Sequence, residues 1–190
     1  NSPPRDQSCV SGLLLGEPVS VIVNHWPSRL GGQNQSSYLR EAAAALSKHI
    51  ADSVLAINPK QKIIIMGDLN DDPMDPSCAE VLGAKRNVKD VEEGGWYNPW
   101  WDVLASGVGT LAYRGQWNLF DQIIINYNLV GKNRSTLKYF KCKVHNDIPG
   151  IRTEEGDRTG YPLRTFARGV YLNGYSDHFP TQIFLTRELK

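Results

Sequence analysis

The chain begins with two short stretches in which apolar and polar residues alternate. The segment CVSGLLLGEPVSVIVNHWP reads as two strands joined by a turn at residues 16–18. In the second strand Val19, Val21 and Val23 share one face, and Ile22 lies on the other. Apolar side chains on both faces predict that this strand is covered on both sides.

Residues 37–57 have the apolar spacing of an amphipathic helix. Ser36 or Ser37 can cap its start, and Pro59 stops it. The run KIIIM at residues 62–66 follows without alternation and predicts a buried strand. A strand, a helix and a strand in this order indicate an α/β fold. The apolar stripe expected to face the sheet is Leu39, Ala42, Ala43, Leu46, Ile50, Val54 and Ile57.

Three later segments also predict strands: QWNLFDQIIIN at 116–126, LKYFKCKV at 137–144 and FPTQIFLT at 179–186. Residues 74–112 are irregular and rich in Gly, Pro and Trp. Because no second long helical period is present, the later strands are expected to pair as antiparallel neighbours. No repeat or linker interrupts the chain, so residues 1–190 are predicted to form a single domain or part of one.

The composition of the chain limits the classes of protein to which it can belong. Hydrophobic residues make up 41% of the chain, which is an ordinary globular value and argues against disorder. The formal net charge is +1, so any site for phosphate must be local rather than spread over the surface. Three scattered cysteines, Cys9, Cys78 and Cys142, form neither a disulfide framework nor a zinc motif. No apolar run of the sequence is as long as a membrane span.

Polar side chains stand at the ends of three predicted strands, where an apolar core would not place them. A polar residue at such a point is most often a turn former or a structural group, so each site alone is weak evidence. Ligands of α/β sheets bind beside the carboxyl ends of strands, and three sites on one rim favour a functional site. They are Asn24 and His25 after VSVIV, Asp68 and Asn70 after KIIIM, and Asp177 and His178 before FPTQIFLT.

Asp121 lies in an otherwise apolar row of a predicted strand, so its carboxylate is expected to be largely buried. A buried carboxylate needs a partner. His178 is one candidate, because a carboxylate that accepts a hydrogen bond from one ring nitrogen leaves the other for chemistry. A buried ion pair with an arginine is the alternative, and the distance from Asp121 to His178 separates the two. The row is Trp117, Leu119, Asp121, Ile123 and Ile125.

Two histidines, three acids and an asparagine, without a protein nucleophile, fit the attack of water on a phosphoester. An acid or a histidine removes the proton from water, and an Asn or His contacts a nonbridging oxygen. A hard divalent cation held by carboxylates would neutralise the phosphate. A calcium loop that starts at Asp68 is excluded, because Pro73 and Ala79 stand where Gly and Glu are needed.

Four motifs in order, VNHWPSR, GDLNDDP, WNLFDQI and YSDHFP, resemble the endonuclease/exonuclease/phosphatase superfamily, in particular its poorly characterised bacterial members. The resemblance covers essentially the whole chain. It implies the C-terminal half of a four-layer α/β/β/α sandwich of the deoxyribonuclease I type, with a mostly antiparallel or mixed sheet and helices on one face. It also implies divalent-metal-dependent hydrolysis of phosphoesters, as a phosphodiesterase, nuclease or phosphatase, usually with Mg²⁺ and otherwise with Mn²⁺ or Ca²⁺.

The resemblance implies a role for each motif residue. His25 matches a general acid or phosphate ligand. Asp68 matches the acid that orients or deprotonates the attacking water, and Asn70 matches the residue that binds phosphate and positions Asp68. His178 matches a base or transition-state stabiliser that Asp121 orients. The residue that matches a metal-site carboxylate is Asp177.

Other residues are candidates for substrate binding. Asn24 and Arg29 lie at the end of the first motif, where Arg29 could contact phosphate or could be an ordinary surface arginine. The arginines of residues 151–169 could line a phosphate groove or pair with neighbouring acids, and the tryptophans of GGWYNPWWD, 94–102, could stack on substrate or form a small core. The arginines are Arg152, Arg158, Arg164 and Arg168, and the acids are Glu154, Glu155 and Asp157.

One departure from the family pattern is large. The first half of the family domain supplies a metal-ligating Glu, and no glutamate here has that context. The chain is therefore expected to be a C-terminal part of the domain, with an apolar sheet face that a missing N-terminal half or a second chain covers. Alone it is expected to be inactive or impaired. The alternative function is a non-catalytic binding or scaffold module that keeps the fold.

Overall fold

Six strands form one mixed sheet that organises residues 6–189, the part of the chain that the computed structural model describes. In order across the sheet they are β1 (Ser8–Leu14), β2 (Glu17–His25), β3 (Lys62–Asp68), β8 (Asp121–Asn126), β5 (Trp96–Tyr97) and β4 (Ala84–Lys85). Strand β3 is parallel to β2 and antiparallel to β8. This arrangement confirms the predicted α/β class and mixed sheet.

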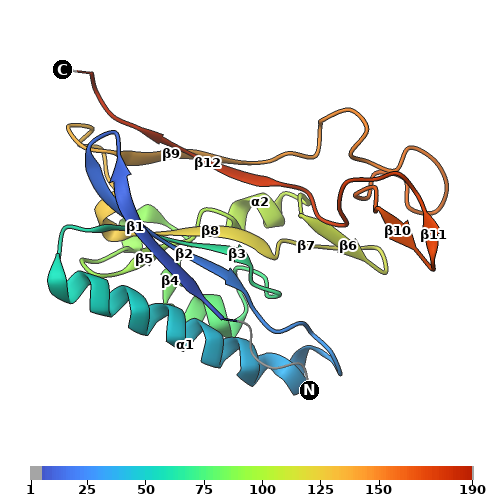
Figure 1. The fold of residues 1–190 in the computed structure, drawn as a ribbon, viewed down its shortest axis with the longest axis horizontal. Coiled ribbons are helices and arrows are strands. Elements are labelled where there is room, and N and C mark those ends of the chain that lie inside the picture. The colour runs from blue at the N-terminus through green and yellow to red at the C-terminus, as the bar shows by residue number, and fades with distance from the viewer. Residues whose placement is uncertain (1–5, 190) are drawn as a thin grey trace.

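The two faces of the sheet have different covers (Figure 1). Helix α1 (Gln33–Ile57) lies on one face, and the antiparallel pair of β9 (Lys138–Val144) and β12 (Thr181–Thr186) lies over the other. Two hairpins project at one end of the molecule: β6 (Leu111–Tyr113) with β7 (Gln116–Asn118), and β10 (Phe166–Ala167) with β11 (Val170–Tyr171). The short helices are η1 (Ser77–Val81), η2 (Val88–Asp90), α2 (Trp101–Ala105) and η3 (Tyr127–Leu129).

Burial on both faces explains the unalternating KIIIM run. Ile63 and Ile65 belong to the core cluster on the α1 side, whereas Ile64 packs with Ile125 on the side of β9 and β12. On β2, Ile22 and Val19 divide between the two clusters in the same way. The predicted two-sided cover of these strands is confirmed.

The predicted stripe of α1 is only partly right, because Ala43, Ile50 and Val54 pack against the core but the other four residues do not. The buried positions are Ser36, Arg40, Ala44, Ser47 and Ala51, while Leu39 and Leu46 are 40% and 47% exposed. The cause is that polar side chains of this face have buried partners, as in the ion pair of Arg40 Nε with Asp71 Oδ1 at 2.6 Å.

The start of α1 also differs from the prediction. The helix begins at Gln33 after Gly32, and no serine side chain caps it. Its end at Ile57, two residues before Pro59, agrees with the predicted stop. The turn that joins β1 to β2 lies one position earlier than predicted. It is at Leu15 and Gly16, which both have positive φ.

The predicted strand at 116–126 is divided into two. Strand β7 pairs with β6, and only β8 joins the main sheet, while Leu119 and Phe120 lie between the two strands. Trp117 and Leu119 consequently pack in a separate cluster with Phe179. Ile123 of β8 packs in this cluster as well, so Trp117, Leu119 and Ile123 still share a packed face although the strand is interrupted.

The expected exposed sheet face is only partly present. Ile183 and Leu185 of β12 pack against the central strands, so this chain covers much of that face itself. The edge strand β1 carries exposed apolar side chains, among them Val10 at 63% and Leu13 at 76%. Among residues 6–189, no helix combines the length and the apolar character that a membrane crossing requires.

Gly67 allows β2 and β3 to approach closely just before the functional residues. Its φ is 139°, and a Cβ at this position would lie 1.9 Å from the backbone oxygen of Asn24. Neither the backbone conformation nor the space tolerates a side chain here. The glycine of GDLN therefore fixes where β3 ends relative to β2.

Gly67→Ala is expected to lower the free energy of unfolding by about 2 kcal/mol or more, through strained backbone and overpacking. Urea unfolding followed by circular dichroism measures the change. Gly12→Ala on exposed β1 is the matched control, because no atom lies within 4 Å of its added Cβ. The control is expected to shift stability by less than about 0.5 kcal/mol. Equal effects of the two substitutions would contradict this account of Gly67.

Candidate active site

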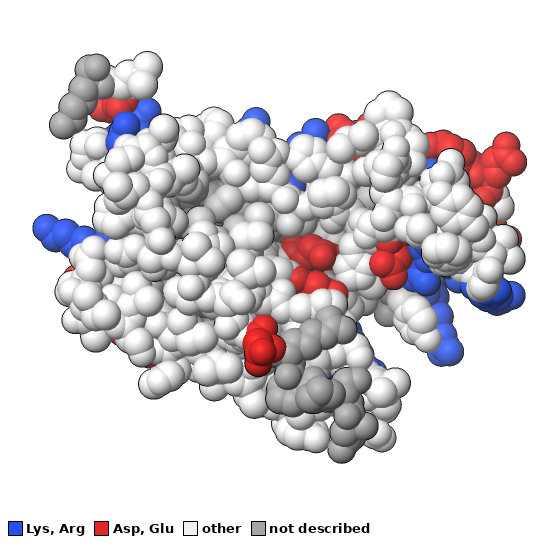
Figure 2. Space-filling model, in the orientation of Figure 1, with Lys and Arg blue, Asp and Glu red and all other residues white. Residues whose placement is uncertain are grey.

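Three titratable residues form a row across neighbouring strands at one end of the sheet. The strand register pairs His25 of β2 with Asp68 of β3, and Asp68 with Asp121 of β8. Paired residues of adjacent strands point to the same face, so the three side chains lie side by side. This face is the one that β9 and β12 cover. Figure 2 shows acidic side chains gathered in the middle of the molecule, with Lys and Arg side chains nearby toward the β6–β7 end.

His178 joins the row from the segment just before β12. Its Nδ1 lies 2.7 Å from Asp121 Oδ2, and both side chains are about four-fifths buried, with 20% and 23% exposed. Asp121 therefore has the histidine partner and not an arginine. Since Nδ1 donates to the carboxylate, Nε2 is the ring atom left to exchange a proton or contact a substrate.

The charges around His178 change its basicity. Burial alone lowers the pKa of His178, but the hydrogen bond to Asp121 and the charges of Asp121, Asp68 and Asp177 outweigh it and raise the pKa above its usual value. The imidazolium form consequently persists to higher pH than in an isolated histidine. Such a group can stabilise developing negative charge.

Asp68 is the central carboxylate of the row. Its Oδ1 accepts a hydrogen bond from the backbone N–H of Asn70 at 3.0 Å, and its Oδ2 lies 3.4 Å from His25 Nε2. Burial and then the charge of Asp121 raise the pKa of Asp68, and these effects exceed the opposing ones of Asn70 and the two histidines. A carboxylate with a raised pKa is a better proton acceptor.

Asn70 holds the end of β3 against the end of β2. Its Nδ2 donates to the backbone oxygen of Trp26 at 2.9 Å, and its φ of 50° lies in the left-handed region that Asn tolerates better than most residues. This turn directs the Asn70 N–H back toward Asp68. Asn70 thus contacts Asp68 through its backbone N–H.

Arg29 has a different environment from the predicted phosphate contact. Its Nε donates to the backbone oxygen of Asn70 at 2.9 Å, and its terminal nitrogen lies 2.7 Å from Asp75 Oδ2. Longer contacts of 3.4 and 3.5 Å reach Asp71 and Asp72, and the guanidinium lies 4.4 Å from the centre of the Phe120 ring. Arg29 is thus held by the loop through Nε and one terminal nitrogen, with 26% of its side chain exposed.

A buried charge network supports the same loop. Asp71 is fully buried with Arg40, and Asp72 Oδ1 accepts the backbone N–H of Leu119 at 2.7 Å. Burial raises the pKa of Asp72 to about 6 against the effects of that hydrogen bond and of Arg29. The acids after GDLN therefore fasten the loop to α1 and to the segment before β8.

Asn24 does not reach the row of acids. Neighbouring residues of a strand point to opposite faces, so Asn24 faces α1 when His25 faces β12. Its Oδ1 accepts hydrogen bonds from Trp26 Nε1 and Ser47 Oγ, both at 3.0 Å, and its Nδ2 donates to Ile22 O at 3.0 Å. The structure thus corrects the predicted substrate-binding role of Asn24, which is a buried structural group.

Asp177, Arg158 and Arg164 lie beside the row, around a separate pocket. The Asp177 side chain is 55% exposed, and its Oδ2 is 3.9 Å from an Arg164 terminal nitrogen. The two remaining arginines of the predicted groove, Arg152 and Arg168, are not among the residues that line this pocket.

The tryptophans of residues 94–102 support the core rather than a substrate. Trp96 and Trp100 are almost completely buried, in two different core clusters. Trp100 Nε1 also donates to the backbone oxygen of Ile123 at 3.1 Å. These contacts favour the small-core interpretation over stacking on bases or sugars.

The donor set does not complete a metal site. Within residues 6–189, no group of three or more His, Cys, Asp or Glu side chains is arranged to hold a metal ion. Asp177 as the expected metal ligand therefore lacks enough companions among the described residues. A divalent cation at this site would need ligands from elsewhere.

Sequence reasoning missed two polar groups near the site. Gln122 is fully buried and donates to the backbone oxygen of Asp71 at 2.7 Å, while its Oε1 accepts from Asn98. A Gln inside the apolar run FDQIII was the available signal. Arg114 lines the pocket beside Asp177 from the β6–β7 turn, and no local pattern distinguishes it.

Comparison with known proteins identifies relatives of this arrangement. The sequence profile described as the Endonuclease/Exonuclease/phosphatase family matches residues 2–187. A mannosyl-6-phosphatase from Bacteroides thetaiotaomicron has a similar structure, with a TM-score of 0.53 and 16% identity over 90% of this chain and 52% of that chain. No functionally curated protein matches.

Two further structures have the same fold. SmcL gives a TM-score of 0.51 and 16% identity over 95% of this chain and 58% of that one. TDP2 of D. rerio, complexed with a single-strand DNA product, gives 0.51 and 17% over 94% and 60%. The chain therefore spans between half and three fifths of the length of these structures.

Asp121→Asn is expected to lower the pKa of His178, because it removes the charge that favours the imidazolium. A histidine with a raised pKa contributes stability that is complete below its unfolded pKa, about 6.5, and is lost as pH rises through its folded pKa. The stability difference between wild type and variant should therefore be largest below pH 6.5 and shrink above it.

NMR titration of the His178 ring and urea unfolding between pH 5 and 9 measure the two effects. Asp52→Asn, which removes only an exposed partner of Lys48, is the control. An identical His178 titration in Asp121→Asn would show that the observed hydrogen bond does not govern this group.

Proposed function

Because this chain belongs to the endonuclease/exonuclease/phosphatase family, we propose that the protein hydrolyses phosphoester bonds by attack of an activated water. The observation that supports the proposal is the 2.7 Å hydrogen bond between His178 Nδ1 and Asp121 Oδ2. Asp121 lies next to Asp68 and His25 on neighbouring strands. The substrate is a phosphoester of a nucleic acid or of a small phosphorylated molecule.

The proton-transfer roles follow from the directions of the pKa shifts. Asp68, whose pKa is raised, takes a proton from the attacking water as the new P–O bond forms. His178, whose pKa is also raised, stays protonated and donates from Nε2 to a nonbridging oxygen. Asp121 holds the His178 ring in position.

His25 and Asn70 complete the proposed site. His25, whose Nε2 lies 3.4 Å from Asp68 Oδ2, binds a phosphate oxygen in this proposal or protonates the leaving oxygen as the second P–O bond breaks. Asn70 fixes Asp68 through its backbone N–H and faces the same end of the strands. Each of these groups touches the substrate or an adjacent catalytic carboxylate.

A divalent cation belongs to the proposal through the family and not through a formed site. Mg²⁺, or else Mn²⁺ or Ca²⁺, would have Asp177 as its ligand in this chain. In this proposal the other ligands come from outside the described residues. The proposed steps above therefore use only this chain's own side chains.

We also propose that a further polypeptide covers β1, either the other half of the family domain or a second chain. Strand β1 is at the edge of the sheet, and all seven of its residues are exposed. An exposed apolar edge strand is a ready site for pairing. Such a polypeptide is also the natural source of the missing metal ligands.

His178→Ala and Asp68→Asn are each expected to reduce hydrolysis of bis-p-nitrophenyl phosphate roughly 100- to 10,000-fold, because each removes a proton-transfer or charge-stabilising group. The assay uses the full-length protein that contains this chain, with and without Mg²⁺. Asp147→Asn, which removes an exposed partner of Lys143, is the control.

Rates that are unchanged in both variants would reject the hydrolase proposal. A full-length protein with no hydrolysis of any phosphoester, but with intact folding, would favour the binding-module alternative.

The isolated chain is expected to associate in solution through β1. Light scattering coupled to size-exclusion chromatography should give a mass above that of one chain. The substitutions Val10→Asp and Leu13→Asp together should shift it toward the monomer, whereas Val88→Asp, at a 44% exposed position of η2, should not. A wild-type chain that stays monomeric at high concentration would contradict the proposal.

A further inference from the structure

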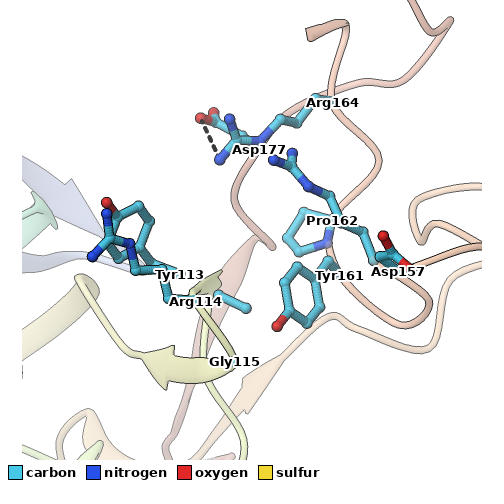
Figure 3. A pocket seen from close by; sticks show the side chains of 10 residues that line it. Tyr113, Arg114, Gly115, Asp157, Tyr161, Pro162, Arg164 and Asp177 are labelled. Carbon is cyan, nitrogen blue, oxygen red and sulfur yellow. Dashed lines mark ion pairs between the residues drawn. The ribbon is translucent and has the colours of Figure 1, made fainter.

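A pocket of about 340 Å³ opens next to the catalytic row, between the β6–β7 hairpin and the long loop before β12 (Figure 3). Tyr113 and Arg114 lie on one side of the opening, and Tyr161 and Pro162 lie on the other. Asp177 forms part of the wall and is the residue directly before His178. The pocket is therefore distinct from the proposed active site but borders the segment that carries His178.

Positive charge predominates in this pocket. Its lining contains Arg114, Arg158 and Arg164 against Asp157 and Asp177. The Arg164–Asp177 contact is long, at 3.9 Å, and within residues 6–189 neither Arg114 nor Arg158 forms an ion pair with a carboxylate. Guanidinium groups that no carboxylate engages are suited to bind a phosphate group.

A series of three packed aromatic rings connects the pocket wall to the segment that carries His178. The Tyr161 and Trp117 rings pack in a T-shaped arrangement with 5.5 Å between centroids, and Trp117 stacks on Phe179 at 6.0 Å. Phe179 is buried and directly follows His178. Tyr161 thus offers a fixed ring surface at a set position relative to His178, against which a ring of the ligand can pack.

The position of Arg114 is not explained by its turn. Arg114 and Gly115 form the two-residue loop of the hairpin with φ of 50° and 83°, a geometry that favours Asn or Gly at the first position. Arg168 and Gly169 form the same kind of loop in β10–β11, with φ of 49° and 79°. The Arg114 guanidinium lies 5.2 Å from the Tyr113 ring centre, which orients it beside the pocket.

We propose that this pocket binds a second phosphate group of the substrate, on the unit next to the phosphoester that His178 contacts. Arg114, Arg158 and Arg164 bind that phosphate, and the ring of the same unit packs on Tyr161. The inference rests on the proposed hydrolase function and specifies its substrates as molecules with two phosphate groups. A substrate with one phosphate occupies the catalytic row alone.

Calorimetric titration tests the pocket without any need for turnover. Thymidine 3′,5′-bisphosphate is expected to bind the chain roughly 10-fold or more tightly than thymidine 5′-monophosphate, because it gains charge-assisted hydrogen bonds. Inositol 1,4-bisphosphate and inositol 1-phosphate form a second pair of ligands. A preference in the thymidine pair indicates a nucleotide source, and one in the inositol pair indicates a sugar-like phosphate source.

Arg114→Asn is the decisive variant. It should remove most of the preference for the bisphosphate while raising the melting temperature, because Asn suits the turn better than Arg. Arg168→Asn makes the same change in the matching turn outside the pocket lining, and should raise the melting temperature with the preference intact. A purely structural role of Arg114 predicts no difference in binding between these two variants.

The proposal is overturned if wild type shows no preference in either ligand pair, or if the preference survives in Arg114→Asn. The experiments can reject the second phosphate site and the hydrolase function independently of each other. Preserved discrimination without hydrolysis would reject the hydrolase function and keep the second phosphate site, whereas hydrolysis without discrimination would do the reverse.

Discussion

Two carboxylates held opposite each other on adjacent strands are the constraint on which the rest of the site depends. The register of β3 and β8 places Asp68 directly across from Asp121. Two carboxylates at such paired positions repel each other when both are charged. His178 offsets the charge on one side through its 2.7 Å hydrogen bond, and His25 lies 3.4 Å from the other carboxylate. The result is a row in which two adjacent carboxylates lie between two imidazoles, and the protonation states of the four groups are linked.

The polar network behind the row keeps this arrangement in place. The loop after Asp68 carries further acids, and Arg29 and Arg40 neutralise them from β2's end and from α1. These buried charges would be costly without partners, so the loop has few alternative positions. The contact of Arg40 with Asp71 also explains why α1 buries a charged side chain among the apolar residues of its packed face. Stability and the geometry of the candidate site thus depend on the same contacts.

The alternation of side chains along strands and the order of the motifs predicted the fold class and the Asp121–His178 pair. The features that were not predicted depend on side-chain partners that only the folded chain brings together. The parity of Asp121 with the isoleucines of its strand correctly indicated the pairing with His178. The same rule, applied to Asn24, would have separated it from His25. The buried face of α1 was not predictable from apolar spacing, because Arg40 enters the core only with Asp71. Arg114 was not predictable, since only the folded hairpin brings it to the pocket.

The most direct test of the account is the pKa of His178 in Asp68→Asn, measured by NMR titration. The hydrogen bond to Asp121 remains in this variant, so any change reports the influence of Asp68 through space. The account predicts that the pKa of His178 falls, because the charge of Asp68 helps to hold the imidazolium. A pKa equal to that of the wild type would show that the carboxylates and histidines do not act as one linked row.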